Sequence, residues 1–73
     1  MPARRLTYRQ IADDLIDRIE RGEYTPGQAL PSRRELAAMY SVSTSTADSA
    51  MTLVIDRGFA YGEPGRGTFV APE

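Results

Sequence analysis

Only three residues, Ser41-Val42-Ser43, separate two segments of helical pattern, so the chain must turn tightly between them. The upstream segment opens at Ser32 with Glu35 three residues later, a capping box that is typical of a helix N-terminus. The downstream segment opens at Ser43, a good N-cap. Its small and apolar residues recur at helical spacing, at Ala47, Ala50, Met51 and Val54. A short helix over about 32–40 and a longer one over about 43–57 therefore predict a helix-turn-helix.

Further elements lie on both sides of this pair. Thr7 and Gln10 form another capping box, and the apolar spacing that follows predicts a first helix from about Thr7 to Arg21. Residues 28–30 are long enough only for a short extended segment. After Gly58, two runs of aromatic and β-branched residues enclose the loop 62–67, which predicts a hairpin.

We therefore expect a mainly α fold with a small β-hairpin wing, that is, a winged helix-turn-helix. The expected order is helix, short strand, helix, turn, helix and two-stranded wing. We expect the chain to divide into a basic N-terminal arm over 1–6, the winged helix-turn-helix domain over 7–70 and a C-terminal tail over 71–73.

Composition excludes several functional classes. A chain of 73 residues forms one small domain, and it contains neither cysteine nor histidine. A disulfide framework, a thiolate metal site and histidine-based catalysis are thus ruled out, and we expect no enzyme, metal or cofactor. No stretch approaches the 18 apolar residues of a membrane span and no export leader is recognisable, so we expect a cytoplasmic chain without a membrane partner.

The charge balance argues against a polybasic module, because the formal net charge is −1. All nine cationic residues are arginine. Coding bias is one explanation, and the other is that the planar guanidinium suits recognition of phosphate and base edges. Acidic residues concentrate on the first helix. Five arginines are instead placed where they could share one face, namely Arg4, Arg5, Arg33, Arg34 and Arg66.

The motifs in order resemble those of the GntR family of bacterial transcription regulators. The linker Pro26-Gly27-Gln28-Ala29-Leu30-Pro31-Ser32 follows the family's PG-x-x-LPS run, Arg34-Glu35-Leu36-Ala37 continues it, and the segment from Gly65 to Val70 resembles its G-x-GTFV wing. This resemblance covers about Tyr8 to Val70. It implies sequence-specific binding of double-stranded DNA by a transcriptional repressor, with the helix at 43–57 in the major groove and the wing at 62–67 at the minor groove.

The resemblance also implies a palindromic operator and a homodimer. Family members dimerise through a C-terminal effector domain, and we expect no small-molecule effector site within these residues. The implied contacts to DNA are Arg34 at the backbone and groove edge, Ser32 at a phosphate, and Gly65 with Arg66 at the wing tip. Small hydroxyl residues match the start of the recognition helix at Ser43, Ser45 and Thr46.

Two positions depart from the family pattern, which places arginine where this chain has Thr44 and Asp48. Threonine cannot make the bidentate guanine contact of arginine, whereas hydroxyls bond either base edge and Asp48 can accept from cytosine N4. The interface predicted on this helix is Thr44, Ser45, Thr46, Asp48 and Ser49. The alternative is a winged-helix module that has lost specific DNA readout and binds another protein, which Asp48 and the acidic balance favour.

Overall fold

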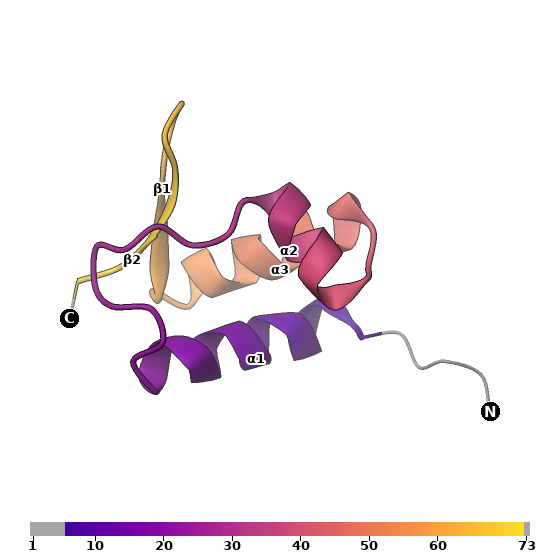
Figure 1. The fold of residues 1–73 in the computed structure, drawn as a ribbon, viewed down its shortest axis with the longest axis horizontal. Coiled ribbons are helices and arrows are strands. Elements are labelled where there is room, and N and C mark those ends of the chain that lie inside the picture. The colour runs from indigo at the N-terminus through magenta and orange to yellow at the C-terminus, as the bar shows by residue number, and fades with distance from the viewer. Residues whose placement is uncertain (1–5, 73) are drawn as a thin grey trace.

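The computed structural model describes residues 6–72 and confirms the predicted winged helix-turn-helix. The described elements run in the order α1 (Tyr8–Glu20), α2 (Arg33–Tyr40), α3 (Thr44–Asp56), β1 (Ala60–Glu63) and β2 (Gly67–Val70). Figure 1 shows α1 along one side of the molecule, α2 on the other side with α3 behind it, and the wing projecting past the helices on the side of α2. No helix within residues 6–72 is long and apolar enough to span a membrane.

Local capping explains where the three helices begin. The side chains of Thr7 and Ser32 each accept a hydrogen bond from the backbone N–H three residues on. In turn, the side chains of Gln10 and Glu35 accept from the backbone N–H of the cap residue. Ser43 caps α3 by accepting from the N–H of Thr46 at 3.1 Å. These bonds satisfy donors that the first turn of a helix leaves unpaired, so the sequence signals act without help from distant residues.

The end of α2 is unusual. α1 and α3 are each followed by a glycine with positive φ, Gly22 and Gly58, and α2 is followed by Ser41 at φ 55°. Ser41 N–H donates to Ala38 O at 3.4 Å and Val42 N–H to Ala37 O at 3.0 Å, which is the bonding of a Schellman motif. Within residues 6–72, Ser41 is the one non-glycine residue with positive φ.

A single apolar core joins the helices. Fully buried Ile11 and Leu15 of α1 and Leu36 of α2 meet Met51 and Val54 of α3. α3 lies at the centre of this packing, because α1, α2 and β1 all contact it. The buried stripe of α3 holds its position in the molecule and leaves the opposite face of the helix exposed.

The wing differs from its prediction at the loop. β1 and β2 pair antiparallel, Gly62 opposite Thr68 and Glu63 opposite Gly67, so three of the residues expected in the loop belong to strands and the turn shortens to 64–66. The hydrogen bond from Arg66 N–H to Glu63 O at 3.0 Å closes it. Proline sets the second position, and Gly65 adopts the φ of 74° that a type II turn needs at the third.

The segment predicted to be extended runs beside this hairpin. Ala29 forms an isolated antiparallel bridge with Phe69, and Leu30 N–H donates to Thr68 O at 2.8 Å. The linker between α1 and α2 is thereby fixed to β2, which ties the wing to the start of α2.

Candidate nucleic-acid interface

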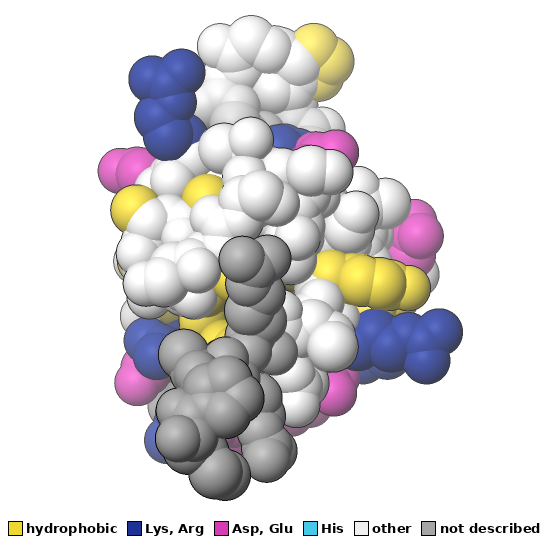
Figure 2. Space-filling view, turned by 90° about the vertical axis from the view of Figure 1, so that its right-hand side faces the viewer, with side chains coloured by type: hydrophobic (Ala, Val, Ile, Leu, Met, Phe, Trp, Pro, Cys, Tyr) yellow, Lys and Arg dark blue, Asp and Glu magenta, His cyan; other side chains and the backbone are white. Residues whose placement is uncertain are grey.

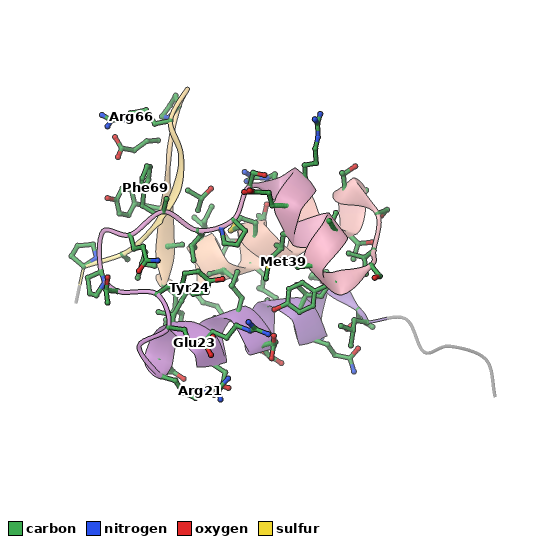
Figure 3. The ribbon with its side chains drawn as sticks, viewed as in Figure 1. Arg21, Glu23, Tyr24, Met39, Arg66 and Phe69 are labelled. Atoms are coloured by element: carbon green, nitrogen blue, oxygen red, sulfur yellow. The ribbon has the colours of Figure 1, made fainter. Side chains whose placement is uncertain are left out.

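Two predicted interface elements, the N-terminus of α2 and the wing, border one open hollow. Arg33 lines it from α2, opposite Arg66 and the rest of residues 62–68, and its volume is about 640 Å³. In Figure 3, Arg66 lies near the wing tip, remote from the helices, whereas Arg21 lies at the far side of the molecule beyond α1. An arginine therefore borders the hollow on each side.

The exposed face of α3 carries most of the predicted contact residues. Burial of Ala47, Ala50, Met51 and Val54 turns the other side of the helix outward. Exposed on that side are Thr44, Ser45, Asp48 and Ser49, and Thr46 is half-buried. This face offers hydroxyl donors and acceptors and one carboxylate.

Some of the predicted hydroxyls are already engaged. Ser43 Oγ accepts from the N–H of Thr46 and lies 3.1 Å from Thr46 Oγ1, and Ser32 Oγ accepts from the N–H of Glu35 at 3.1 Å. Ser32 and Ser43 therefore have a capping role in the structure, and their contact with phosphate stays a prediction.

Five of the described arginines fall into two groups. Arg18, Arg21 and Arg57 form ion pairs with acidic residues of α1 at 3.0, 3.1 and 2.8 Å. Arg34 and Arg66 are exposed and form no ion pair within residues 6–72. The acidic charge of α1 is thus partly neutralised on its own side of the molecule, away from these two cations.

Arg33 and Asp48, both predicted DNA contacts, bind each other. Arg33 Nε donates to Asp48 Oδ1 and joins the first residue of α2 to the exposed face of α3. No local sequence signal predicts this pair, since 15 residues separate the partners. Arg4 and Arg5, also predicted contacts, lie outside the described residues.

Figure 2 views the end of the molecule at which the turn between α2 and α3 lies. The described part of this end is mostly neutral polar side chains and backbone, with cationic and acidic groups toward its edges. In this view the described part of the end carries no continuous basic patch.

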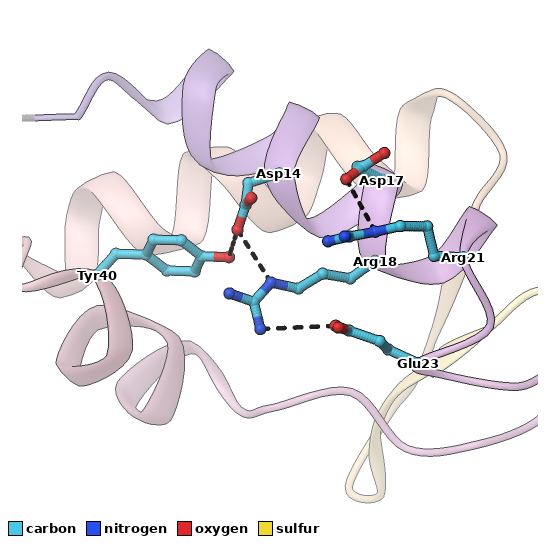
Figure 4. Close-up of polar contacts among 6 residues, drawn as sticks. All are labelled: Asp14, Asp17, Arg18, Arg21, Glu23 and Tyr40. Atoms are coloured by element: carbon cyan, nitrogen blue, oxygen red, sulfur yellow. Dashed lines mark hydrogen bonds and ion pairs between the residues drawn. The ribbon is translucent and has the colours of Figure 1, made fainter.

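A polar network between α1 and α2, apart from the proposed interface, holds the two helices together (Figure 4). Tyr40 Oη donates to Asp14 Oδ2, which also accepts from Arg18 Nε at 3.0 Å, and Arg18 reaches Glu23 at 3.7 Å. The Tyr40 hydroxyl, helped by Arg18, lowers the pKa of the Asp14 carboxyl. Burial, followed by the hydrogen bond to Asp14, raises the pKa of Tyr40 well above its usual value. No sequence signal links these residues, yet they hold the C-terminal end of α2 against α1.

Known proteins are similar to this chain in sequence and in fold. The model of the family described as bacterial regulatory proteins, gntR family, matches residues 7–70. The transcriptional repressor NagR of Bacillus subtilis is 39% identical over 88% of this chain, which spans 26% of NagR. YtrA of Sulfolobus acidocaldarius, a GntR-family transcription factor, is 42% identical over 90% of this chain and 69% of its own, with a TM-score of 0.83.

A second similar structure contains DNA. The DNA-binding domain of AraR in complex with operator ORR3 is 29% identical and covers 97% of this chain and 88% of its own, with a TM-score of 0.84. The curated relatives are longer, since this chain spans about a quarter of NagR. By its family match and by its three-helix, two-strand architecture, the chain belongs to the gntR family of bacterial regulatory proteins.

Proposed function

We propose that this chain binds double-stranded DNA sequence-specifically in the cytoplasm, as the DNA-binding domain of a transcriptional repressor. The observation that carries the proposal is the exposed hydroxyl face of α3 together with two exposed arginines, Arg34 on α2 and Arg66 on the wing, that form no ion pair within residues 6–72. The operator-bound AraR domain and the repressor NagR support it by similarity. We assign the chain no catalytic role.

In the proposed complex, α3 lies in the major groove and the wing at the adjacent minor groove. A helix of 13 residues is about 20 Å long, and the groove is about 12 Å wide, so the N-terminal half of α3 can read bases while its C-terminal half stays in the core. Thr44, Ser45 and Ser49 are the proposed base contacts, since hydroxyls both donate and accept.

The cations have a different proposed role. Arg34, at the N-terminal turn of α2, and Arg66, on the wing, bind the backbone and the minor groove edge. The Pro64-Gly65 turn is closed by the hydrogen bond from Arg66 N–H to Glu63 O and carries Arg66 at the end of the wing. Such contacts position the protein on the duplex, and the α3 contacts specify the sequence.

Selection from a random duplex library, followed by fluorescence anisotropy on the selected and scrambled sequences, tests the proposal. We expect Arg34→Ala and Arg66→Ala each to weaken binding and to make the dependence of log K on log salt shallower by about 0.9. Arg21→Ala is the matched control, because Arg21 pairs with Asp17 on α1, and it should leave both quantities unchanged. Equal binding of selected and scrambled DNA by the wild type would refute sequence-specific recognition.

We further propose that two copies bind a palindromic operator. The selected sequences should then contain an inverted repeat with half-sites about one helical turn apart, since the symmetry of a dimer is mirrored in its site. Selected sites with a single half-site, bound at a ratio of one chain per duplex, would contradict the dimer.

A protein-binding module is the second candidate function. Asp48 favours it, because an exposed carboxylate on the face of α3 repels phosphates. This candidate predicts that the chain binds no duplex, even at low salt. Arg34→Ala and Arg66→Ala should then leave the measured anisotropy of the DNA unchanged.

A further inference from the structure

Asp48 lies in the middle of the surface proposed to meet DNA. Thr44 and Thr52 stand one turn before and after it on the same exposed stripe of α3. Its carboxylate accepts from Arg33 Nε, and the two side chains are 59% and 43% exposed. The partners therefore neutralise each other at a place where DNA would attract one and repel the other.

The exposure of this pair means that it opens readily. Surface ion pairs are weak in water, so separating the partners shifts an equilibrium by no more than about fivefold. A DNA phosphate can therefore replace Asp48 as the ionic partner of Arg33 with little loss of free energy. The carboxylate then needs a new donor, because it would otherwise stand unpaired beside the backbone charges.

The four bases differ in what they offer a carboxylate in the major groove. Guanine presents two acceptors there, and thymine presents an acceptor and a methyl group, so neither suits an anion. Adenine has an amino donor beside the N7 acceptor. Cytosine presents the N4 amino donor without a neighbouring acceptor on the same base, which makes it the best partner for a carboxylate.

We propose, as a step that rests on the DNA-binding function above, that Asp48 is a specificity-determining residue that selects cytosine. On a matched site the Arg33–Asp48 pair opens, Arg33 binds a phosphate and Asp48 accepts from cytosine N4. On other sequences the carboxylate has no donor to replace Arg33, and binding is weaker. Asp48 thus lowers affinity for non-operator DNA and confers a base preference at one position of each half-site.

Libraries selected separately with the wild type and with Asp48→Ala test this inference. The wild type should prefer cytosine at one position by about fivefold or more, and Asp48→Ala should lose the preference at that position alone. Affinity for scrambled DNA should rise about threefold to tenfold, which is the effect of removing a unit charge about 6 Å from a phosphate at dielectric constants of about 80 to 40.

Two further variants separate base readout from a general charge effect. Asp48→Asn should move the preference from cytosine to adenine, since an amide pairs with adenine N6 and N7. Asp56→Ala is the matched control, because it removes the same charge from an exposed position about 12 Å further along α3, and it should retain the cytosine preference. Circular dichroism checks that each variant keeps its helices.

The outcomes distinguish this inference from the function on which it rests. A wild type that selects no sequence refutes both. A wild type that selects a sequence, with Asp48→Ala and Asp48→Asn selecting the same base at every position, refutes the role of Asp48 and leaves DNA binding intact. Loss of the preference in Asp56→Ala as well would show a charge effect without readout and would also overturn the inference.

Discussion

Replacing Ser41 by glycine should stabilise the domain. Ser41 follows α2 with φ 55°, in a conformation that L-residues with a side chain adopt at a cost. Its N–H and that of Val42 donate to the last carbonyls of α2, so the turn cannot relax to negative φ without breaking these bonds. Glycine would keep the bonds and remove the steric cost.

The magnitude follows from two opposing terms. The left-handed conformation costs a non-glycine residue roughly 1 to 2 kcal/mol. Glycine offsets about 0.5 to 1 kcal/mol of this gain, because it loses more conformational freedom on folding. Ser41 is exposed and its side chain makes no hydrogen bond in the structure that would be lost within residues 6–72. With the middle of each range, the net gain in the free energy of unfolding is about 0.7 kcal/mol.

Thermal and urea unfolding followed by circular dichroism measure this gain. For a domain of this size it corresponds to a rise in Tm of about 3 to 6 °C. Ala38→Gly, at an exposed position inside α2, is the matched control and should lower the free energy of unfolding by about 1 kcal/mol. Equal destabilisation by both substitutions would refute the reasoning, because glycine would then act only through chain entropy.

Two other changes address the packing of α2. Tyr40→Phe should cost about 1 kcal/mol at neutral pH through loss of the bond to Asp14. It should also flatten the pH dependence of unfolding at both ends: the lowered pKa of Asp14 gives stability that is lost as pH falls through that pKa, and the raised pKa of Tyr40 gives stability that is lost as pH rises above about 10. Urea titrations across pH, with wild type in parallel, check this, and an unchanged profile would contradict it. Leu36→Ala should cost about 2 to 5 kcal/mol, because Leu36 is fully buried, and a loss below 1 kcal/mol in the same assay would show that the core collapses around the site.

The helices were predictable because their signals are local. Thr7 with Gln10 and Ser32 with Glu35 form capping boxes within single turns, and Ser43 caps α3 alone, so neither signal depends on the rest of the fold. The wing was harder to predict from the sequence. Its loop was expected over 62–67, but the antiparallel register of β1 and β2 extends the strands and leaves only 64–66 in the turn, and strand pairing is decided by both partners at once.

Contacts between distant residues could not be read from the sequence. The partners of Arg33–Asp48 and Tyr40–Asp14 are 15 and 26 residues apart, and each pair requires helices to be packed first. The residues of the proposed interface were named one by one, some from the family resemblance and others, Arg33 and Asp48 among them, from their charge and position in the sequence. That two of them bind each other follows only from how α2 lies across α3.

The sites of the arginines answer the objection that an acidic chain should not bind a polyanion. Arg18, Arg21 and Arg57 pair with acidic residues of α1, so the net charge of −1 describes the whole chain and not the surface proposed to meet DNA. If Arg4 and Arg5 contact phosphates together with Arg33, Arg34 and Arg66, five contacts give a slope of log K against log salt of about −4.5 for one domain, or about a 500-fold loss of affinity between 50 and 200 mM salt. Replacing Arg4 and Arg5 by alanine should reduce the slope to about −2.7, measured by anisotropy on the selected site. An unchanged slope would remove the N-terminal arm from the interface and leave recognition to the two helices and the wing.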